Sequence, residues 1–176
     1  IRAIHFEKKK APDSLSDAAV LADGRLLLVS DAGHEFVLLD AAKGQSRVID
    51  LLGLLEEANL PAPRGRPDEI DLEGAAVSGS RIILVGSASL KRPKPKPGQK
   101  DNAERISDII PASGEGFDHS NYVFTLRDQG AGGAPALERA FDLRAVLLAL
   151  PMLAPFRELP SKDNGVDVEG AAIVGE

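Results

Sequence analysis

Short apolar runs separated by turn residues dominate the pattern of this chain. Arg25–Ser30 is one such run, and Arg81–Gly86 is another with almost the same order of residues. Each run follows a stretch of small residues and a turn that contains glycine; these stretches are Ser16–Val20 and Glu73–Val77. Short apolar segments bounded by turn residues are typical of β-strands. The pattern therefore predicts pairs of neighbouring strands rather than long helices.

The same unit is repeated along the sequence, and its first part returns at Glu169–Ile173. Upstream of the second and third copies, Val48–Leu51 and Ala140–Leu143 resemble each other. Each of them leads into a helix-like apolar segment, at 51–60 and at 143–152. Self-similarity of this kind is typical of folds built from repeated units. We therefore expect equivalent structural units, joined by short helices.

Two further strands complete each unit. Glu35–Leu39 and Asn121–Leu126 are apolar segments that follow the first strand pair, and a last strand follows a turn. Four short antiparallel strands per repeat, with small residues on the innermost strand, describe a β-propeller blade. A solenoid or a sandwich is the competing architecture. A propeller explains better why the repeats begin with a carboxylate and a glycine.

The sequence thus predicts an all-β fold, a partial β-propeller of about two and a half four-stranded blades from a six-bladed ring. We expect residues 13–60 to form blade one and 61–142 blade two, with an inserted loop at 91–120. Residues 143–176 form the connection and the start of blade three, and 1–12 an outer strand of the closing blade. The chain is then expected to be one piece of a longer polypeptide, whose remaining propeller segment is its partner.

Composition narrows the choice of ligand. The net charge of −6 at pH 7 argues against nucleic acid, because neutralising phosphates needs a basic face. The longest apolar stretch, Leu143–Phe156, is broken by Arg144 and two prolines and is too short to span a bilayer, so no membrane partner is expected. There is no cysteine, which excludes thiolate metal sites and leaves cytoplasm, periplasm and secretion open.

A repeated acidic motif carries the candidate chemistry. Asp71 and Glu73 are two residues apart, as are Asp167 and Glu169, so each pair is expected on one side of an extended strand facing the axial channel. Asp17 occupies the corresponding region of the first repeat, where Ser16 replaces the glutamate. Clustered carboxylates suit Ca²⁺, which takes six to eight oxygen ligands, better than zinc.

A purely structural role for the two glutamates stays open, since a buried carboxylate can accept backbone N–H groups of the neighbouring blade. The glycine that follows each glutamate can equally serve a tight turn. The sequence alone does not decide between this role and a metal or ligand site.

Polar loops at the strand ends supply further candidates. Ser87, Ser89, Lys91 and Arg92 form a set that can bind phosphate, or alternatively a polar turn. The basic, proline-rich stretch 91–100 can grip an anionic ligand or form a solvated loop.

Two histidines are the weakest candidates, as general acids or bases. His34 lies in the loop 31–35 beside a glutamate, and a solvated loop histidine is the alternative. His119 lies in Asp118–Asn121, which has the residue types of a nucleophile and base, although adjacency in sequence is not triad geometry.

The segment Asp71–Arg92, with its Asp-hydrophobic-Glu-Gly motif and Gly-Ser-x-Ser-x-Lys-Arg ending, resembles a bacterial domain-of-unknown-function family of propellers, and 163–170 looks like its later repeat. The Glu-Gly motif is more distantly similar to that of esterase-like phytases and other calcium-bearing propellers. The resemblance implies pocket roles for Glu73 and Glu169, with Asp71 and Asp167 beside them, and further blades beyond the last motif. It carries over no catalytic assignment.

Two functions from different classes follow. The first is a calcium-associated hydrolase acting on phosphate or other esters at the axial face, with a small-molecule or phosphorylated ligand. The second is a non-enzymatic module that binds a ligand or protein and holds a structural metal. A third possibility is that this piece has no function by itself. A shared fold does not decide among them.

Overall fold

Eight strands form two four-stranded antiparallel sheets. The structure, a computed structural model, describes residues 14–60, 70–107 and 119–174. In the first sheet the order is β1 (Leu15–Val20), β2 (Leu26–Ser30), β3 (Glu35–Asp40) and β4 (Gln45–Asp50). In the second it is β5 (Leu72–Ser78), β6 (Arg81–Gly86), β7 (Tyr122–Arg127) and β8 (Ala136–Asp142). Of the predicted all-β propeller, the structure confirms a mostly-β fold with four antiparallel strands in each of the first two repeats. The outer strand predicted at 1–12 lies outside the described residues.

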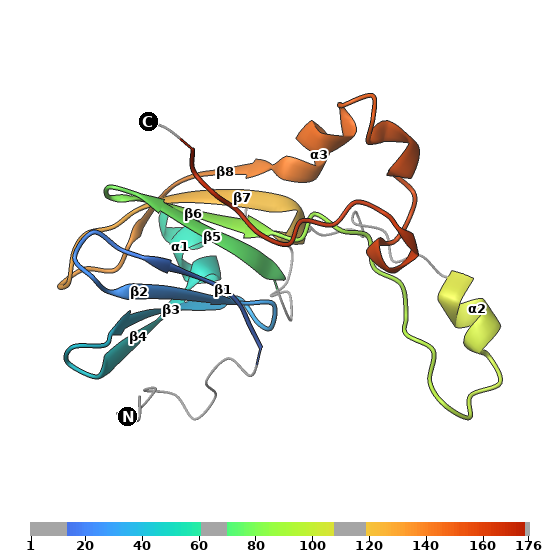
Figure 1. The fold of residues 1–176 in the computed structure, drawn as a ribbon, viewed down its shortest axis with the longest axis horizontal. Helices are drawn as coiled ribbons and strands as arrows, with labels where there is room; N and C mark the ends of the chain where they lie inside the picture. Colours follow the sequence, from blue (N-terminus) through green and yellow to red (C-terminus); the bar gives the residue numbers. More distant parts are fainter. Residues whose placement is uncertain (1–13, 61–69, 108–118, 175–176) are drawn as a thin grey trace.

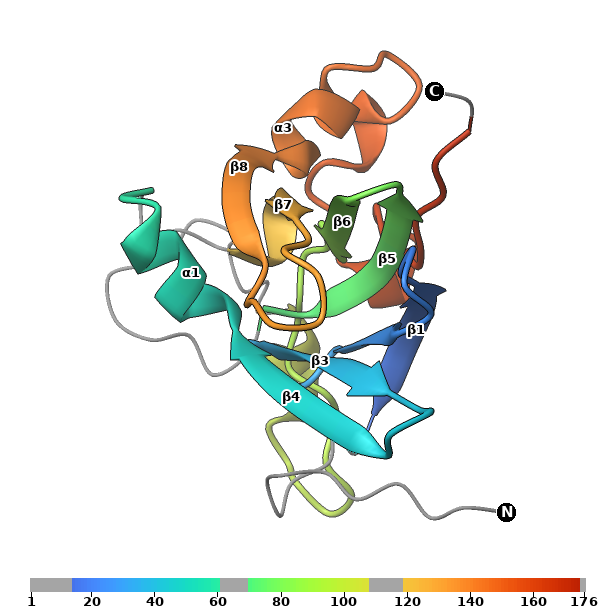
Figure 2. The same ribbon diagram turned by 90° about the vertical axis from the view of Figure 1, so that its left-hand side faces the viewer.

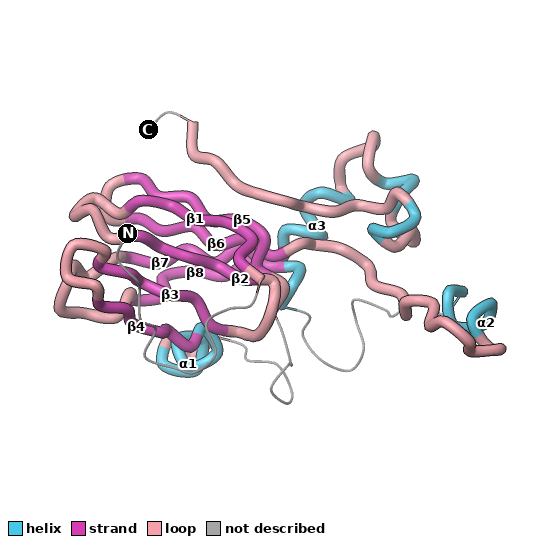
Figure 3. The backbone as a smooth tube through the Cα atoms, turned by 60° about the horizontal axis from the view of Figure 1, so that its bottom comes forward, coloured by secondary structure: helices cyan, strands magenta, loops and turns pink. Residues whose placement is uncertain are grey.

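Short helices occupy the connections: two of them fall within the segments predicted to be helix-like, 51–60 and 143–152, and one, at 102–107, lies in the stretch 91–120 that was expected to be a loop. They are α1 (Leu51–Glu57), α2 (Asn102–Ser107), α3 (Leu143–Leu148), and the 3-10 turns η1 (His119–Asn121), η2 (Ala154–Phe156) and η3 (Ser161–Asp163). The strands form one body in Figure 3, and α2 stands apart from it. No helix in the described ranges is both long and apolar enough to cross a bilayer.

The two sheets meet at their first strands. β1 and β5 lie side by side, and the Asp17 carboxylate on β1 accepts a 2.9 Å hydrogen bond from the backbone N–H of Ala75 on β5. From this contact the sheets diverge toward β4 and β8, with α1 in the opening between them (Figure 2). Small side chains at Ala19 and Ala75, which pack in the shared core, allow this close approach of the first strands.

The hydrophobic core fills the space between the sheets. Phe36 of the first sheet and Phe124 of the second are both almost fully buried, and the leucines of α1 pack with them. Truncating such a side chain to alanine costs about 3–5 kcal/mol. One core therefore holds both sheets and fixes their relative position.

Local capping shows that the repeat extends to the helices. The Asp50 side chain accepts the N–H of Leu52 at the start of α1, and the Asp142 side chain accepts the N–H of Ala145 at the start of α3. A carboxylate at the N-cap satisfies backbone donors that have no partner inside the helix. Both helices therefore begin at the last residue of the preceding strand by the same means.

The strand order gives each sheet two distinct ends (Figure 1). The β1–β2, β3–β4, β5–β6 and β7–β8 turns lie at one end, and the β2–β3, β4–β5 and β6–β7 connections lie at the other. The two cavities described below occupy these opposite ends.

The third copy of the motif, at Glu169–Ile173, packs directly against β5. Residues 165–174 form no strand ladder in the described structure, but they run next to β5, where a Cβ atom on Gly74 would lie 2.7 Å from the backbone nitrogen of Ala171. Only glycine at position 74 permits this approach.

Candidate functional site

A β-bulge places Glu73 at the start of the second sheet. Leu72 pairs with Gly86 and Gly74 pairs with Val85, so Glu73 is the extra residue. The first sheet has the same bulge, between Leu15 and Asp17. Bulges re-aim a side chain out of the regular alternation and are frequent next to functional sites.

The acidic residues of the second and third motifs converge on one cavity of about 460 Å³. We call it the acidic pocket. The residues that line it are Asp31, Asp71, Glu73, Ser87, Ser89, Lys91, Arg92, Lys94, Ser161, Lys162, Asp167 and Glu169. Side chains from both sheets and from the C-terminal segment thus face one space, and its size is that of a small-molecule site.

The charge of this pocket acts most strongly on Glu73. The pKa of Glu73 is raised to about 7, and burial is the largest cause. Repulsion from the carboxylates of Asp71, Glu169, Asp31 and Asp167, in that order, supplies the rest of this rise. A carboxyl group with this pKa exchanges its proton near neutral pH.

Asp167 experiences the same environment. Burial, followed by the charge of Glu169, raises its pKa above the ordinary value for aspartate. A hydrogen bond with the Ser161 side chain acts in the opposite direction and is the weaker effect. Two of the pocket carboxyls are therefore harder to ionise than isolated ones.

Asp31 contributes an unsatisfied oxygen to this pocket. Its Oδ1 atom is buried and accepts no hydrogen bond from any described residue. A buried carboxylate oxygen without a donor is costly, and in native proteins such atoms are usually paired with water or an ion. The Oδ1 atom of Asp31 is therefore the pocket atom whose burial most clearly calls for a bound water molecule or cation.

Asp71, by contrast, is already engaged. Its Oδ2 atom accepts a 2.5 Å hydrogen bond from the Ser87 hydroxyl and lies 3.3 Å from the Nζ of Lys91. The Ser87 and Ser89 hydroxyls are 3.0 Å apart. Asp71 has a φ of 60° and Ala88 a φ of 51°, both in the left-handed region that non-glycine residues rarely adopt. The pocket thus has a serine-lined wall in a strained backbone conformation.

The route by which Asp71 and Glu73 converge differs from the predicted strand alternation. Asp71 precedes β5 and has a left-handed backbone, and Glu73 is the bulged residue. The two side chains line one pocket because of these irregularities rather than because of a regular two-residue period.

The C-terminal segment is fixed against the serine wall by backbone hydrogen bonds. The N–H of Val168 donates to the carbonyl oxygen of Ser87 at 2.7 Å, and the N–H of Ser161 donates to that of Leu90 at 3.1 Å. The buried Arg144 of α3 donates to the carbonyl oxygens of Ala88 and Arg157, and it thereby links the serine-containing segment to the C-terminal segment. These contacts position Asp167 and Glu169 on the pocket.

The basic residues of the pocket differ in availability. Arg92 donates to the two carboxylate oxygens of Asp163 at 2.7 and 3.0 Å, so that carboxylate engages its guanidinium. Lys94 and Lys162 are exposed at the rim. A basic rim therefore lies beside the carboxylates.

The other predicted site residues lie elsewhere. Asp17 accepts the N–H of Ala75 between the sheets and does not line the acidic pocket. The Nδ1 atom of His34 lies 2.9 Å from Oδ1 of Asp50, the residue that caps α1. His119 opens the turn η1, and its side chain is not among the described parts of the chain.

The sequence analysis named the loop 31–35 as a candidate but assigned its role to His34 rather than to Asp31. Its signal lies in the register of the repeats, because Asp31 follows β2 as Ser87 follows β6, and both line the pocket. Lys94 was considered only as part of the basic stretch 91–100, and Ser161 and Lys162 were not considered as site residues.

The carboxylates do not form a ready-made coordination shell. Within the part of the chain that the structure describes, no three acidic or histidine side chains stand close enough together to hold a metal ion as they are. A cation in this pocket would require the side chains to turn toward it.

Comparison with known proteins gives one result. Residues 18–116 and 119–176 match the model of a family described as a protein of unknown function, DUF3616. No curated protein and no solved structure matches the chain.

Proposed function

The chain belongs to the DUF3616 family of proteins of unknown function, and we propose that its acidic pocket binds Ca²⁺ and hydrolyses phosphate or other esters. The observation that carries the proposal is the combination in one cavity of an unsatisfied buried oxygen on Asp31 with a Glu73 carboxyl whose pKa lies near 7.

The donor set favours a hard cation. Asp31, Glu73, Asp167 and Glu169 offer only oxygen atoms, and the described residues that line the pocket include no histidine. Calcium accepts irregular oxygen coordination, so modest side-chain rotations suffice to bring these carboxylates to the ion. A bound calcium ion would offset the carboxylate repulsion and polarise a phosphoryl or carbonyl oxygen. Asp71 is the least available of the pocket carboxylates and is left out of this donor set, because its Oδ2 atom already contacts Ser87 and Lys91.

Glu73 is the proposed general acid or base. Its pKa of about 7 lets it take a proton from a water molecule or return one to a leaving group at neutral pH. Its place in the bulge directs it into the cavity, and burial is the largest cause of its raised pKa.

The basic rim is the proposed site for the anionic part of the substrate. Lys91, Lys94 and Lys162 line the cavity together with the carboxylates. Ammonium groups beside a cation site bind a phosphate or carboxylate group through charge-assisted hydrogen bonds. A phosphorylated small molecule fits a pocket with carboxylates on one side and lysines on the other better than a neutral ester does.

We also propose that the two sheets are neighbouring blades of a propeller. The contact between β1 and β5, the divergence toward β4 and β8, and the passage of residues 165–174 beside β5 support this arrangement. In it, the acidic pocket lies where the first strands of successive blades begin.

The proposal is tested by measuring turnover of a phosphoester and carboxyl-ester panel with calcium and with a chelator. Calcium-dependent hydrolysis that falls at least about a hundredfold in Glu73→Gln is expected, since general acid–base groups contribute that much. Glu57→Gln, an exposed position on α1, is the matched control. Absence of turnover on the whole panel contradicts the hydrolase proposal.

A non-enzymatic module with a structural metal is the second candidate. The pocket carboxylates come from the first sheet, the second sheet and the C-terminal segment, so an ion between them would cross-link three parts of the fold. A melting temperature that rises with calcium, without any turnover, identifies this second function.

A further inference from the structure

A second cavity, of about 530 Å³, lies at the hairpin end of the sheets, opposite the acidic pocket. We call it the hairpin pocket. The β3–β4 hairpin and the turn that follows β7 form its walls, and Arg25 reaches it from the start of β2. The residues that line it are Arg25, Leu38, Asp40, Lys43, Gly44, Gln45, Ser46, Arg47, Ala131 and Gly133. It shares no residue with the acidic pocket.

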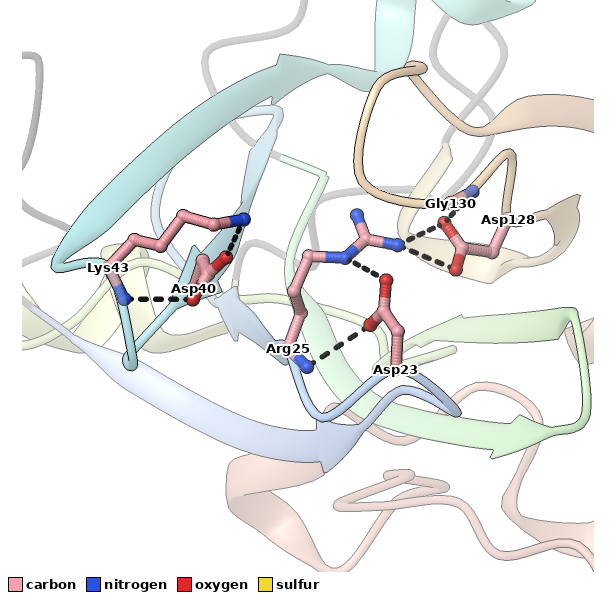
Figure 4. A network of polar contacts seen from close by, with 6 residues as sticks. All are labelled: Asp23, Arg25, Asp40, Lys43, Asp128 and Gly130. Atoms are coloured by element: carbon pink, nitrogen blue, oxygen red, sulfur yellow. Dashed lines mark hydrogen bonds and ion pairs between the residues drawn. The ribbon is translucent and has the colours of Figure 1, made fainter.

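Arg25 is held rigidly at this cavity. Its Nε atom donates to Asp23 at 2.7 Å, and its Nη2 atom donates to both carboxylate oxygens of Asp128 at 2.9 and 2.7 Å. The residue is only 7% exposed. Figure 4 shows the third guanidinium nitrogen, Nη1, pointing away from both aspartates. A guanidinium fixed at two of its nitrogens presents the remaining one in a preorganised direction.

The other cations of the hairpin pocket come from the β3–β4 hairpin. Lys43 lies 2.8 Å from Asp40 and is well exposed. Arg47 is exposed on β4 and also lines the cavity. The cavity is thus lined by three cationic side chains and one carboxylate, in a protein whose net charge is −6.

The cationic side chains of the hairpin pocket differ in the role that each can have toward an anion. Asp23 and Asp128 together more than offset the single charge of Arg25, so Arg25 contributes a directed hydrogen-bond donor and no net positive charge. The attraction for an anion comes from Arg47, because Asp40 partly offsets Lys43. Long exposed side chains attract an oxyanion, and a buried fixed donor orients it.

We propose that the hairpin pocket binds a small oxyanion, a phosphate or carboxylate group on a low-molecular-weight ligand, through Arg25 Nη1, Arg47 and Lys43. This site is independent of the proposed hydrolytic activity, because it lies at the other end of the strands and uses other residues. The ligand is small because the cavity volume is that of a small-molecule site.

The test is a thermal-unfolding titration of the 176-residue chain with inorganic phosphate and, separately, with citrate. Sodium chloride at equal ionic strength provides the reference, because it screens exposed charges without occupying a site. A saturable rise in melting temperature of about 3 °C at tenfold excess over the dissociation constant is expected with one or both probes. The stronger probe identifies phosphate or carboxylate as the preferred group.

The double variant Lys43→Gln, Arg47→Gln should lose this rise, whereas Lys100→Gln, an exposed lysine outside both cavities, should keep it. Both altered positions are exposed, so the variant is expected to fold, and its melting temperature without ligand verifies this. Two results overturn the proposal: wild type responds to neither probe more than to sodium chloride, or the double variant responds as wild type does. Isothermal calorimetry with the same probes provides the second measurement.

Discussion

Gly74 and Ala171 approach so closely that a Cβ atom on Gly74 would lie 2.7 Å from the Ala171 nitrogen. The contact involves backbone atoms rather than a flexible side chain, so a Cβ atom at position 74 can be accommodated only if the C-terminal segment moves. Because Glu169 and Asp167 are on this segment, the packing at Gly74 determines whether they reach the acidic pocket.

Gly74→Ala is therefore expected to displace the C-terminal segment and weaken calcium binding, while costing about 1–3 kcal/mol of stability as overpacking does. Calorimetric titration with calcium and urea unfolding measure the two effects. Gly132→Ala is the control, because a Cβ atom there meets no neighbour within 4 Å. Equal calcium affinity in wild type and Gly74→Ala would contradict the packing role.

The raised pKa of Glu73 predicts a pH-dependent stability. Between pH 4.5 and about 7 the folded protein keeps a proton on Glu73 that the unfolded chain has lost, so stability falls as pH rises through this window. Glu73→Gln should abolish this part of the fall and be more stable than wild type at pH 8, by about 1 kcal/mol once solvent screening is allowed for. Urea unfolding at pH 5 and pH 8 measures it, with Glu57→Gln as control. An equal difference between variant and wild type at both pH values argues against the raised pKa.

Asp31→Asn tests the unsatisfied oxygen. Removing its charge takes one anionic ligand from the acidic pocket, and calcium affinity should fall about tenfold, since charge count tunes calcium sites. Without calcium the variant should be no less stable than wild type, because a repulsive charge near Glu73 is lost. Asp101→Asn, on an exposed loop, is the matched control. Unchanged calcium affinity in Asp31→Asn would remove Asp31 from the site.

The ion pair between Arg25 and Asp128 links the two sheets, with both side chains less than a tenth exposed. Asp128→Ala leaves the Arg25 charge with Asp23 alone and should cost about 3 kcal/mol, the lower end for a broken buried pair. Asp40→Ala breaks the solvent-screened pair with Lys43 and should cost much less. Urea unfolding compares them, and similar losses in the two variants would show that burial does not strengthen the link.

The repeat in the sequence was sufficient to predict the four-stranded units. The runs Arg25–Ser30 and Arg81–Gly86 become β2 and β6, and the predicted helical connections become α1 and α3. Hydrophobic period and turn residues are local signals, and these elements depend mainly on local sequence.

The site was less accessible to sequence reasoning. The convergence of Asp71 and Glu73 depends on a bulge and a positive φ, and neither has a strict residue signature. The engagement of Arg92 by Asp163 and of His34 by Asp50 depends on tertiary contacts, which no spacing rule reveals. The hairpin pocket was not anticipated, because its residues come from three separate turns.

Strand order equal to chain order has a consequence for biosynthesis. Each strand pairs only with strands adjacent to it along the chain, so the first sheet can form its ladder once residue 50 has left the ribosome. Its apolar face, however, packs against the second sheet in one shared core, so this face stays exposed to solvent until β5–β8 have been synthesised. The nascent chain thus passes through a stage with paired strands and an uncovered face, when binding by a chaperone would have its greatest effect.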